Sequence, residues 1–476
     1  MKTAIVNGDV VVWKNQRQSI MRKANLIFEN DRIIDIIPSG QQIGDVFDDV
    51  IDASGMLVCP GFINTHTHGT VQIEGIYSLD WSRRDLFSYN YLATQPIEGR
   101  RPKYTVEEAR ILSLNFLVKI LKMGSTTIVE MGASGTYADV FAELAGEVGI
   151  RAYTALGFRS AELQFDKQDR LQYAWDEEKG LRDFDSAMKH FHKYDNTYDG
   201  RIKGFIEPRN ADTCTPELLK AAMMAANELN APLEIHTAQS LFEFQEIVRR
   251  TGKTPVQFLH SVGLLSPRTI LGHCVFTTGH SQVAWPGDED QRLLAETGTS
   301  IAHSPSIFNR DGTSFESFSR YRKYGVNVSI ATDMFPEDMI NEMRVASNMS
   351  KLVEKDYSAG TAWEVFEAAT VGGAKALNRD DLGKLMPGAK ADIVLVDLAN
   401  ILIGPYADPV KILVHTANGR DVDTVIVDGR VVVRNKKIQM LDIDEKEVLA
   451  KGQAIAERLW TEHEFPMKET AGATNQ

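Results

Sequence analysis

Four apolar, strand-like runs in this chain end in residue types that bind metal ions. The first run ends at His66, with His68 two residues later, and the other runs end at His236, His273 and Asp333. Side chains two apart on a strand point to the same side, so His66 and His68 are placed to bind one ion together. Strands that end in such residues are typical of a βα barrel with a metal site at the carboxyl ends of its strands.

The length of the chain fits one barrel and a smaller additional domain, because the chain has 476 residues and a βα barrel uses about 250. Helical stretches, for example residues 106–122 and 216–229, separate most of the candidate barrel strands. These strands are residues 61–65, 126–130, 152–157, 203–207, 233–235, 269–272, 300–302 and 326–331. Eight strands are the number that a closed barrel of this kind needs.

Both ends of the chain contain short β-rich runs separated by Asn, Asp and Gly turns, which predict antiparallel sheet. These runs are residues 3–6, 10–13, 24–28, 32–37, 391–397 and 422–433, the last with a hairpin turn at Asp428-Gly429. We therefore predict an α/β protein in which a distorted (β/α)8 TIM barrel is inserted into a small β-sandwich domain built from both termini. The predicted boundaries are 1–59 and 383–440 for the sandwich, 60–382 for the barrel, and 441–476 for a C-terminal helix and a disordered tail.

The composition argues against nucleic-acid and membrane partners. The chain has 52 basic and 65 acidic residues and a net charge of -13, which disfavours binding to nucleic acids or anionic membranes. No apolar stretch approaches the roughly 20 residues that cross a bilayer, and no N-terminal run has the pattern of a signal peptide. The 3 cysteines lack CxxC spacing, as expected for reduced thiols. We expect a cytoplasmic homo-oligomer that acts on a small molecule.

The ordered motifs resemble those of the amidohydrolase superfamily, in particular its TRZ/ATZ chlorohydrolase and deaminase branch. The resemblance covers nearly the whole chain, and it implies metal ligation by His66, His68, His236 and Asp333, with His273 polarising the substrate or positioning the water. The motifs that carry it are Pro60-Gly-Phe-Ile-Asn-Thr-His66-Thr-His68, His236, His273, Ala302-His303-Ser-Pro305, Thr332-Asp333 and Gly383-Lys-Leu-Met-Pro-Gly-Ala-Lys-Ala-Asp392.

The chemistry of these ligands independently supports a metal-activated water. Neutral imidazoles and one carboxylate suit Zn²⁺ or Fe²⁺ and leave a coordination position for water. An ion held in this way lowers the pKa of its water to about 7, and Asp333 is placed to take the proton. The fourth strand ends at Glu207 instead of the lysine that bridges two ions in related hydrolases. We therefore predict one divalent ion per subunit, Zn²⁺ in the first place, with Fe²⁺, Mn²⁺ and Co²⁺ as alternatives.

The motif after the fifth strand departs from the deaminase pattern. Many deaminases of this branch carry His-x-x-Glu, in which the glutamate transfers a proton to a ring nitrogen. This chain has His236-Thr-Ala-Gln239, and glutamine cannot transfer a proton. Hydrolysis of an amide, urea or carbamate does not need this proton transfer, because the carbonyl is already electrophilic and Asp333 or His273 can protonate the leaving nitrogen. We therefore predict hydrolysis of a non-peptide C–N bond in a small organic molecule.

Two alternatives remain open. Deamination of a triazine, purine or pyrimidine becomes possible if Glu207 or Glu130 supplies the missing acid. A catalytically inactive barrel that serves as a scaffold is the other alternative, although such a chain is expected to have lost one or more ligands.

Five residues are predicted to contact the substrate at the mouth of the barrel. His303 ends the seventh strand, and Trp285 and Phe308 lie in loops after the sixth and seventh strands, where barrel enzymes place substrate contacts. The aromatic-rich segment 69–101 either lines an apolar pocket or shields the mouth. The predicted substrate-binding residues are Gln239, His303, Glu207, Trp285 and Phe308.

Overall fold

The computed structural model describes residues 1–462 except 42–43, 45, 70–103, 133–134 and 169. Two four-stranded parallel sheets form its centre, in the orders β11-β8-β7-β6 and β12-β13-β14-β15. Parallel bridges between Ile206 and Leu233 and between Thr67 and Asp333 join the two sheets at both edges. The eight strands are β6 (Phe62–Thr67), β7 (Ser125–Glu130), β8 (Arg151–Thr154), β11 (Ile202–Gly204), β12 (Leu233–Thr237), β13 (Thr269–His273), β14 (Ser300–His303) and β15 (Asn327–Ile330).

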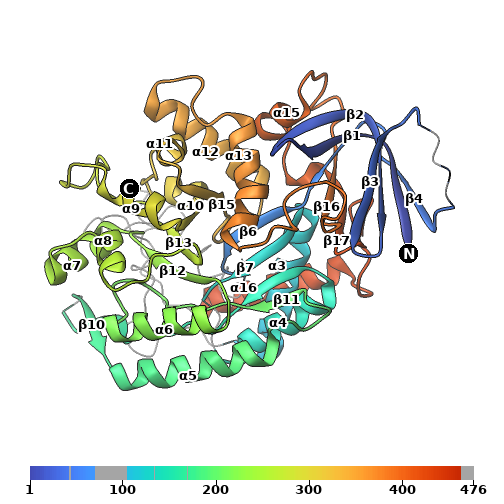
Figure 1. The fold of residues 1–476 in the computed structure, drawn as a ribbon. Coiled ribbons are helices and arrows are strands. Elements are labelled where there is room, and N and C mark those ends of the chain that lie inside the picture. Colours follow the sequence, from blue (N-terminus) through green and yellow to red (C-terminus); the bar gives the residue numbers. More distant parts are fainter. Residues whose placement is uncertain (42–43, 45, 70–103, 133–134, 169, 463–476) are drawn as a thin grey trace, which may run out of the picture.

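These strands match the eight sequence predictions to within a few residues, and helices separate most of them and cover the outside of the sheets (Figure 1). Local signals fix where several helices begin. Thr105 and Glu108 form a capping box at the start of α3, and Thr215 caps α6 in front of Pro216. The helices between the strands are α3 (Val106–Lys122), α4 (Thr136–Val148), α5 (Glu177–Tyr194), α6 (Pro216–Glu228), α7 (Leu241–Thr251), α8 (Pro255–Ser261), α9 (Glu289–Thr297), α10 (Pro305–Arg310) and α11 (Phe318–Lys323).

After β15 the chain continues through further helices before it returns to the terminal sheet. A π-helical turn at Ala368–Gly372 separates two of these helices, Ala362–Glu367 and Gly373–Ala376. These later helices are α12 (Met339–Glu354), α13 (Ala362–Glu367), α14 (Gly373–Ala376), α15 (Pro409–His415) and α16 (Glu445–Glu462). A hairpin of β9 (Ala161–Phe165) and β10 (Leu171–Trp175), which the sequence patterns did not predict, follows β8.

Strands from both ends of the chain form one nine-stranded sheet, at the right in Figure 1. Strand β5 pairs with β1 on one side and with C-terminal β16 on the other, so the two ends of the chain meet there. The strands are β1 (Lys2–Lys14), β2 (Arg17–Glu29), β3 (Arg32–Pro38), β4 (Asp49–Asp52), β5 (Met56–Pro60), β16 (Ile393–Asp397), β17 (Val422–Val427), β18 (Arg430–Arg434) and β19 (Lys437–Ile438).

The structure corrects two predictions for the N-terminal strands. Residues 3–6 and 10–13 belong to one strand, β1, because Asn7 and Gly8 form a register shift within it and do not turn the chain back. The prediction of purely antiparallel pairing is also wrong, since β4 and β5 both pair with β1 in parallel. The predicted hairpin at Asp428-Gly429 is confirmed as the turn between β17 and β18.

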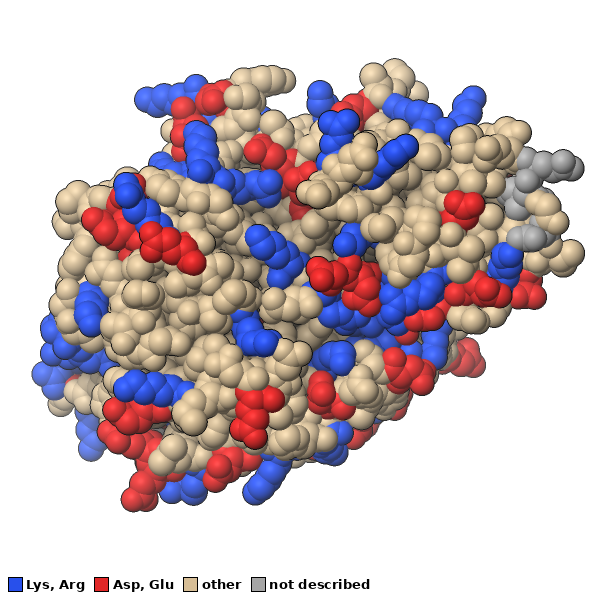
Figure 2. Space-filling model, viewed as in Figure 1, with Lys and Arg blue, Asp and Glu red and all other residues tan. Residues whose placement is uncertain are grey.

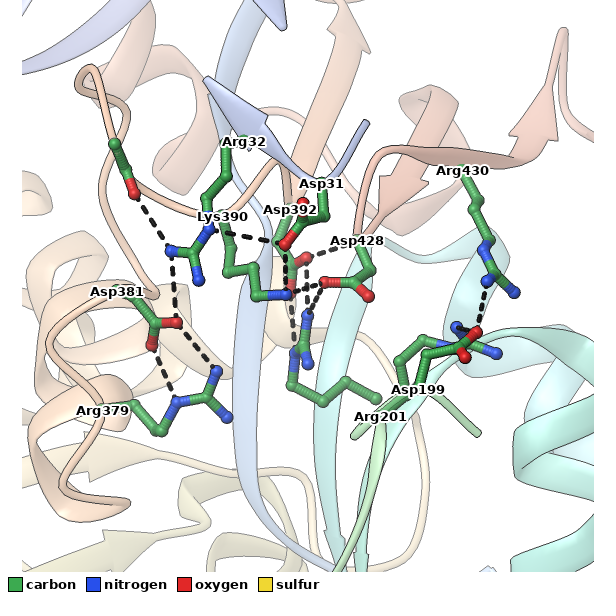
Figure 3. Close-up of polar contacts among 12 residues, drawn as sticks. Asp31, Arg32, Asp199, Arg201, Arg379, Asp381, Lys390, Asp392, Asp428 and Arg430 are labelled. Atoms are coloured by element: carbon green, nitrogen blue, oxygen red, sulfur yellow. Dashed lines mark hydrogen bonds and ion pairs between the residues drawn. The ribbon is translucent and has the colours of Figure 1, made fainter. Parts of the chain in front are cut away.

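A buried ion network joins the terminal sheet to the barrel strands. Arg151 at the start of β8 is 1% exposed and donates hydrogen bonds to Asp392 and to Asp428, 3.1 and 3.0 Å away. Lys390 lies between Asp428 and Asp31, with its Nζ 2.6 and 2.7 Å from their carboxylates (Figure 3). Each buried charge therefore has an opposite charge within hydrogen-bond distance, which is the condition under which burial is tolerated.

The exposed surface carries charges of both signs. On the face shown in Figure 2, acidic side chains lie beside basic ones over much of the surface. None of the described helices is long and apolar enough to cross a membrane.

We expect Arg151→Met to lower the free energy of unfolding by about 3–5 kcal/mol, because it leaves the Asp392 carboxylate buried without its cation. Urea unfolding followed by circular dichroism measures the loss. Arg430→Met is the matched control, since Arg430 binds the exposed Asp199 at the surface and surface ion pairs contribute little. Equal unfolding midpoints for the two variants would show that the network does not hold the two parts together.

Candidate metal centre

The Nε2 atoms of three histidines converge where β6 and β12 end. His68 Nε2 lies 3.2 Å from His66 Nε2 and 3.2 Å from His236 Nε2. Two nitrogens bound to one tetrahedral zinc ion lie about 3.3 Å apart, because each Zn–N bond is about 2.0–2.1 Å long. The spacing of the three nitrogens therefore fits a single ion.

The other ring nitrogen of each histidine faces an oxygen atom, which favours the tautomer with its proton on Nδ1. His68 Nδ1 donates to the carbonyl of Met131 at 2.9 Å, and His236 Nδ1 donates to the carbonyl of Arg209 at 2.8 Å. His66 Nδ1 donates to Glu234 Oε1 at 2.6 Å. All three Nε2 atoms consequently present lone pairs to one another. Lone pairs at this distance repel, and a cation among them converts the repulsion into ligation.

Asp333 and His273 complete the group. Asp333 Oδ1 is 3.4 Å from His68 Nε2, and its Oδ2 is 3.5 Å from His273 Nε2. The potential ligand atoms form two sets, each within 4.8 Å: one of His66, His68 and His236, and one of His66, His273 and Asp333. The structure thus brings together all five residues that the sequence placed at strand ends.

The backbone is strained at three of these strand ends. Ala238, Cys274 and Asp333 have φ angles of 51°, 57° and 61°, in the left-handed region that residues with a side chain rarely adopt. Ala238 and Cys274 follow the strands that carry His236 and His273, and Asp333 is itself a residue of the centre. Strain of this kind collects at functional sites, where the surrounding structure holds it in place.

Burial keeps the histidines neutral and therefore able to bind a metal ion. It lowers the pKa of His68 to about 4, with a further contribution from the Arg209 charge. It also holds the pKa values of His66, His236 and His273 well below the usual range. For a carboxylate burial acts in the opposite direction and raises the pKa of Asp333 to about 7.

Two glutamates that organise the site were not predicted from the sequence. Glu234 and His66 are both 0% exposed, and burial raises the pKa of Glu234 well above its usual range. Glu243 accepts hydrogen bonds from the backbone N–H groups of Ala238 and Gln239, at 2.7 and 2.9 Å, and so fixes the turn after His236. The Ser240-x-x-Glu243 spacing is a capping signal that marks this turn in the sequence.

The predicted substrate-binding residues have different surroundings. Phe308 packs against His273, with the ring centroids 4.7 Å apart, and His303 is buried against Phe315 at 4.4 Å. Trp285 packs on Phe244 in an apolar cluster that also contains Phe308. The predicted role of segment 69–101 falls almost entirely on residues 70–103, outside the described part of the chain.

Glu207 and Gln239 are both buried. Glu207 Oε1 accepts from the backbone N–H of Gly132 at 2.8 Å and lies 3.4 Å from Arg209 Nη1. Glu207 belongs to neither set of potential metal ligands. Burial raises its pKa to about 7.

We expect His68→Ala to weaken Zn²⁺ binding by more than about 100-fold, because His68 Nε2 is the nitrogen that faces both other histidines. Zinc retained after desalting, measured by elemental analysis, reports the change. His303→Ala is the control, since His303 is a buried histidine of the same region that belongs to neither ligand set. Retention of zinc by His68→Ala at the parent's level would rule out this centre.

Comparison with known proteins identifies the family of this chain. The model of the amidohydrolase family matches residues 57–432. A 5'-deoxyadenosine deaminase of Methanothermobacter thermautotrophicus is 31% identical over 444 residues, which cover 92% of this chain and 95% of that protein. A 5-methylthioadenosine/S-adenosylhomocysteine deaminase of Thermoanaerobacter pseudethanolicus is 29% identical over 448 residues, covering 93% and 96%.

Solved structures show the same fold. An adenosine deaminase from Xanthomonas campestris with bound zinc has a TM-score of 0.81 at 21% identity, covering 96% of this chain and 98% of that one. An atrazine chlorohydrolase from Arthrobacter aurescens complexed with zinc has a TM-score of 0.76 at 21% identity, covering 95% and 100%. The predicted resemblance and the predicted enzyme class, a hydrolase of carbon–nitrogen bonds other than peptide bonds, are confirmed. The chain belongs to the amidohydrolase family.

Proposed function

We propose that this chain hydrolyses the C–N bond of an amide, urea or carbamate in a small organic molecule, with one zinc ion held by His66, His68, His236 and Asp333. When bound, the ion supplies a water of lowered pKa and an electrophile for the carbonyl oxygen. Neutral imidazole nitrogens and carboxylate oxygens are donors that zinc binds in catalytic sites. The convergence of the three Nε2 atoms at 3.2 Å is the observation that carries the proposal.

Protein groups handle the protons. Asp333 takes a proton from the attacking water and returns it to the leaving nitrogen, a task that suits its carboxylate because it lies beside both His68 and His273. His273 Nε2 lies beside Asp333 and donates a hydrogen bond to the carbonyl oxygen as negative charge develops on it. Phe308 packs on the His273 ring and excludes water from that side, which strengthens the hydrogen bond.

The choice between acyl hydrolysis and deamination depends on Gln239, because its side chain cannot transfer a proton. It stands three residues after His236 and is 9% exposed. Its amide oxygen accepts a hydrogen bond from an N–H next to a carbonyl, as in an amide or urea, but the side chain delivers no proton to a ring nitrogen. Of the other predicted contacts, His303 and Trp285 are proposed to shape the remaining wall of the substrate site.

Deamination of a purine nucleoside is the second candidate, favoured by the names of the relatives that are 29–31% identical. In that reaction Glu207 takes the part of the missing acid. Its pKa of about 7 and its Oε2, which has no partner among the described residues, suit the transfer of a proton to a ring nitrogen. Glu207 stands two residues before Arg209, and the carbonyl oxygen of Arg209 accepts a hydrogen bond from His236. Glu207 is therefore on a segment that contacts a proposed ligand.

For the architecture we propose a distorted (β/α)8 barrel over residues 60–382 and a β-sandwich built from residues 1–59 and 383–440. Residues 441–476 form the C-terminal helix and a tail. The closure of the eight parallel strands at both edges and the sheet shared by the two termini support this division. A homo-oligomer in the cytoplasm stays a prediction, and the three free, buried cysteines fit a reducing compartment.

The test is a substrate panel on the zinc-loaded protein. Aryl ureas, amides and carbamates are assayed for amine release, and adenosine, 5'-deoxyadenosine, methylthioadenosine and triazines for release of ammonia. We expect a substrate among the acyl compounds with kcat/KM above about 10⁴ M⁻¹s⁻¹, the range of enzymes on their own substrates. Ammonia release from a nucleoside at that rate, with no acyl compound cleaved, would overturn the proposal in favour of the second candidate.

Variants of two buried side chains separate the mechanisms. If acyl hydrolysis is the reaction, Gln239→Glu lowers its rate by about 10-fold or more, because a carboxylate replaces the neutral amide next to the carbonyl, and Glu207→Gln changes it little. If deamination is the reaction, Glu207→Gln lowers kcat by about 10²–10⁴-fold, the contribution of a general acid, and Gln239→Glu raises it. The ratio of the two effects identifies the acid.

A further inference from the structure

Glu234 lies inside the ring of strands, on the same strand and the same face as His236. Both residues belong to β12 and are two positions apart, so their side chains point to the same side. The carboxylate of Glu234 reaches across to β6, where its Oε1 accepts the hydrogen bond from His66 Nδ1 at 2.6 Å. Neither side chain of this pair is exposed at all.

Gly272 on the neighbouring strand makes room for this pair. A Cβ atom added at Gly272 would lie 2.7 Å from His66 Nδ1 and 3.4 Å from Glu234 Oε1. Real Cβ atoms do not approach a ring nitrogen so closely, so any larger residue would displace His66. Gly272 pairs with His236 in the parallel register of β12 and β13, and the strand geometry gives it no way to move aside.

His66 differs from its two partners in the acceptor of its Nδ1 proton. His68 and His236 donate to backbone carbonyls at 2.9 and 2.8 Å, whereas His66 donates to a carboxylate at 2.6 Å. Hydrogen bonds to a charged acceptor are shorter and roughly twice as strong as neutral ones. A carboxylate on Nδ1 also increases the basicity of Nε2, the atom that faces the other histidines.

The second carboxylate oxygen of Glu234 destabilises the Glu234–His66 pair when no cation is bound. Glu234 Oε2 is buried and has no hydrogen-bond partner among the described residues. A buried carboxylate with a single neutral donor is destabilising, because the charge has left water without full compensation. A divalent ion held by His66 Nε2 would offset that charge.

We infer that Glu234 is a positioning residue of the metal centre, fixing the ring of His66 and increasing the affinity of the centre for a divalent ion. The inference rests on the proposed ligand set. Glu234 itself is not a ligand, since it belongs to neither group of potential ligand atoms. It acts through His66, and a metal-linked carboxylate–imidazole pair is a known way to orient a ligand and raise its basicity.

The experiment measures Zn²⁺ affinity by competition with a chelator, and the visible spectrum of the Co²⁺-loaded protein. Glu234→Gln keeps an oxygen that accepts from His66 Nδ1 but removes the charge. We expect a 10–100-fold loss of Zn²⁺ affinity, about the effect of removing an outer partner of a ligand, and a shifted Co²⁺ spectrum. The metal-free variant should unfold at about the same temperature as the parent, because glutamine keeps the oxygen that accepts from His66 Nδ1.

Glu342→Gln is the matched control. Glu342 is also 0% exposed, with one oxygen accepting from the backbone N–H of Ser306 at 2.9 Å and the other without a partner among the described residues. The hydrogen bond of Glu342 to Ser306 involves no histidine of the centre. Its substitution should leave the Zn²⁺ affinity and the Co²⁺ spectrum unchanged.

The outcomes are distinguishable. Unchanged Zn²⁺ affinity in Glu234→Gln, together with loss of binding in His66→Ala, overturns this inference and leaves the proposed metal centre intact. Unchanged binding in His66→Ala overturns the proposed centre itself. If Glu234→Gln does not fold, Glu234→Asp gives the answer: it keeps the charge but is too short for the 2.6 Å contact, and a parent-like affinity in that variant refutes the role in positioning His66.

Discussion

Three imidazole nitrogens that all present lone pairs meet at 3.2 Å, and the rest of the site exists to hold them there. Each ring is fixed from behind by an acceptor for its Nδ1 proton, so none can rotate to relieve the repulsion. The arrangement is unfavourable until a cation enters, which makes it a site of high affinity for one. The buried, neutral state of the histidines follows from the same enclosure, because burial lowers their pKa values.

The terminal sheet contributes to this precision through a short connection. Strand β5 ends at Pro60 and β6 begins at Phe62, so a single residue separates the terminal sheet from the strand that carries His66. The pairing of β5 with β16 therefore sets the position at which β6 enters the ring of strands. The buried contacts of Arg151 in β8 with Asp392 and Asp428 join the terminal sheet to the parallel strands at a second place. The terminal sheet thus helps to place the strand that carries His66.

The grouping of these residues was predictable because its signal is local. A strand alternates its side chains with a period of two, and the end of a parallel strand faces the mouth of a barrel, so the convergence of His66, His68, His236, His273 and Asp333 follows from pattern and order. Which of them are proposed as ligands came from the resemblance to the amidohydrolase superfamily. Glu234 carried the same signal, a charged residue two positions before a ligand within an apolar strand. Its partner, however, is 168 positions away, and only the closure of the ring brings the two together.

Other features depended on tertiary packing that no local pattern encodes. Asn7 and Gly8 read as a turn, yet the partner strand β2 holds them as an irregularity within one strand. Trp285 was predicted from its place in a loop, and its packing on Phe244 is set by how that loop folds onto α7. Glu207 was predicted as a substrate contact, and its hydrogen bond to the backbone of Gly132 arises from the approach of two strand ends.

Gln239 stands out as a chemical change in a site that is otherwise complete. The turn that carries it is still fixed by two hydrogen bonds to Glu243, and each of the three histidine ligands still has its acceptor. A barrel that had become a scaffold would have no reason to keep buried, strained and mutually repelling groups, since each of them costs stability. Their presence argues for a functional site, and the neutral amide of Gln239 favours a proton route other than that of a glutamate. A substrate whose carbon is already activated by its own carbonyl needs least from the residue that was replaced.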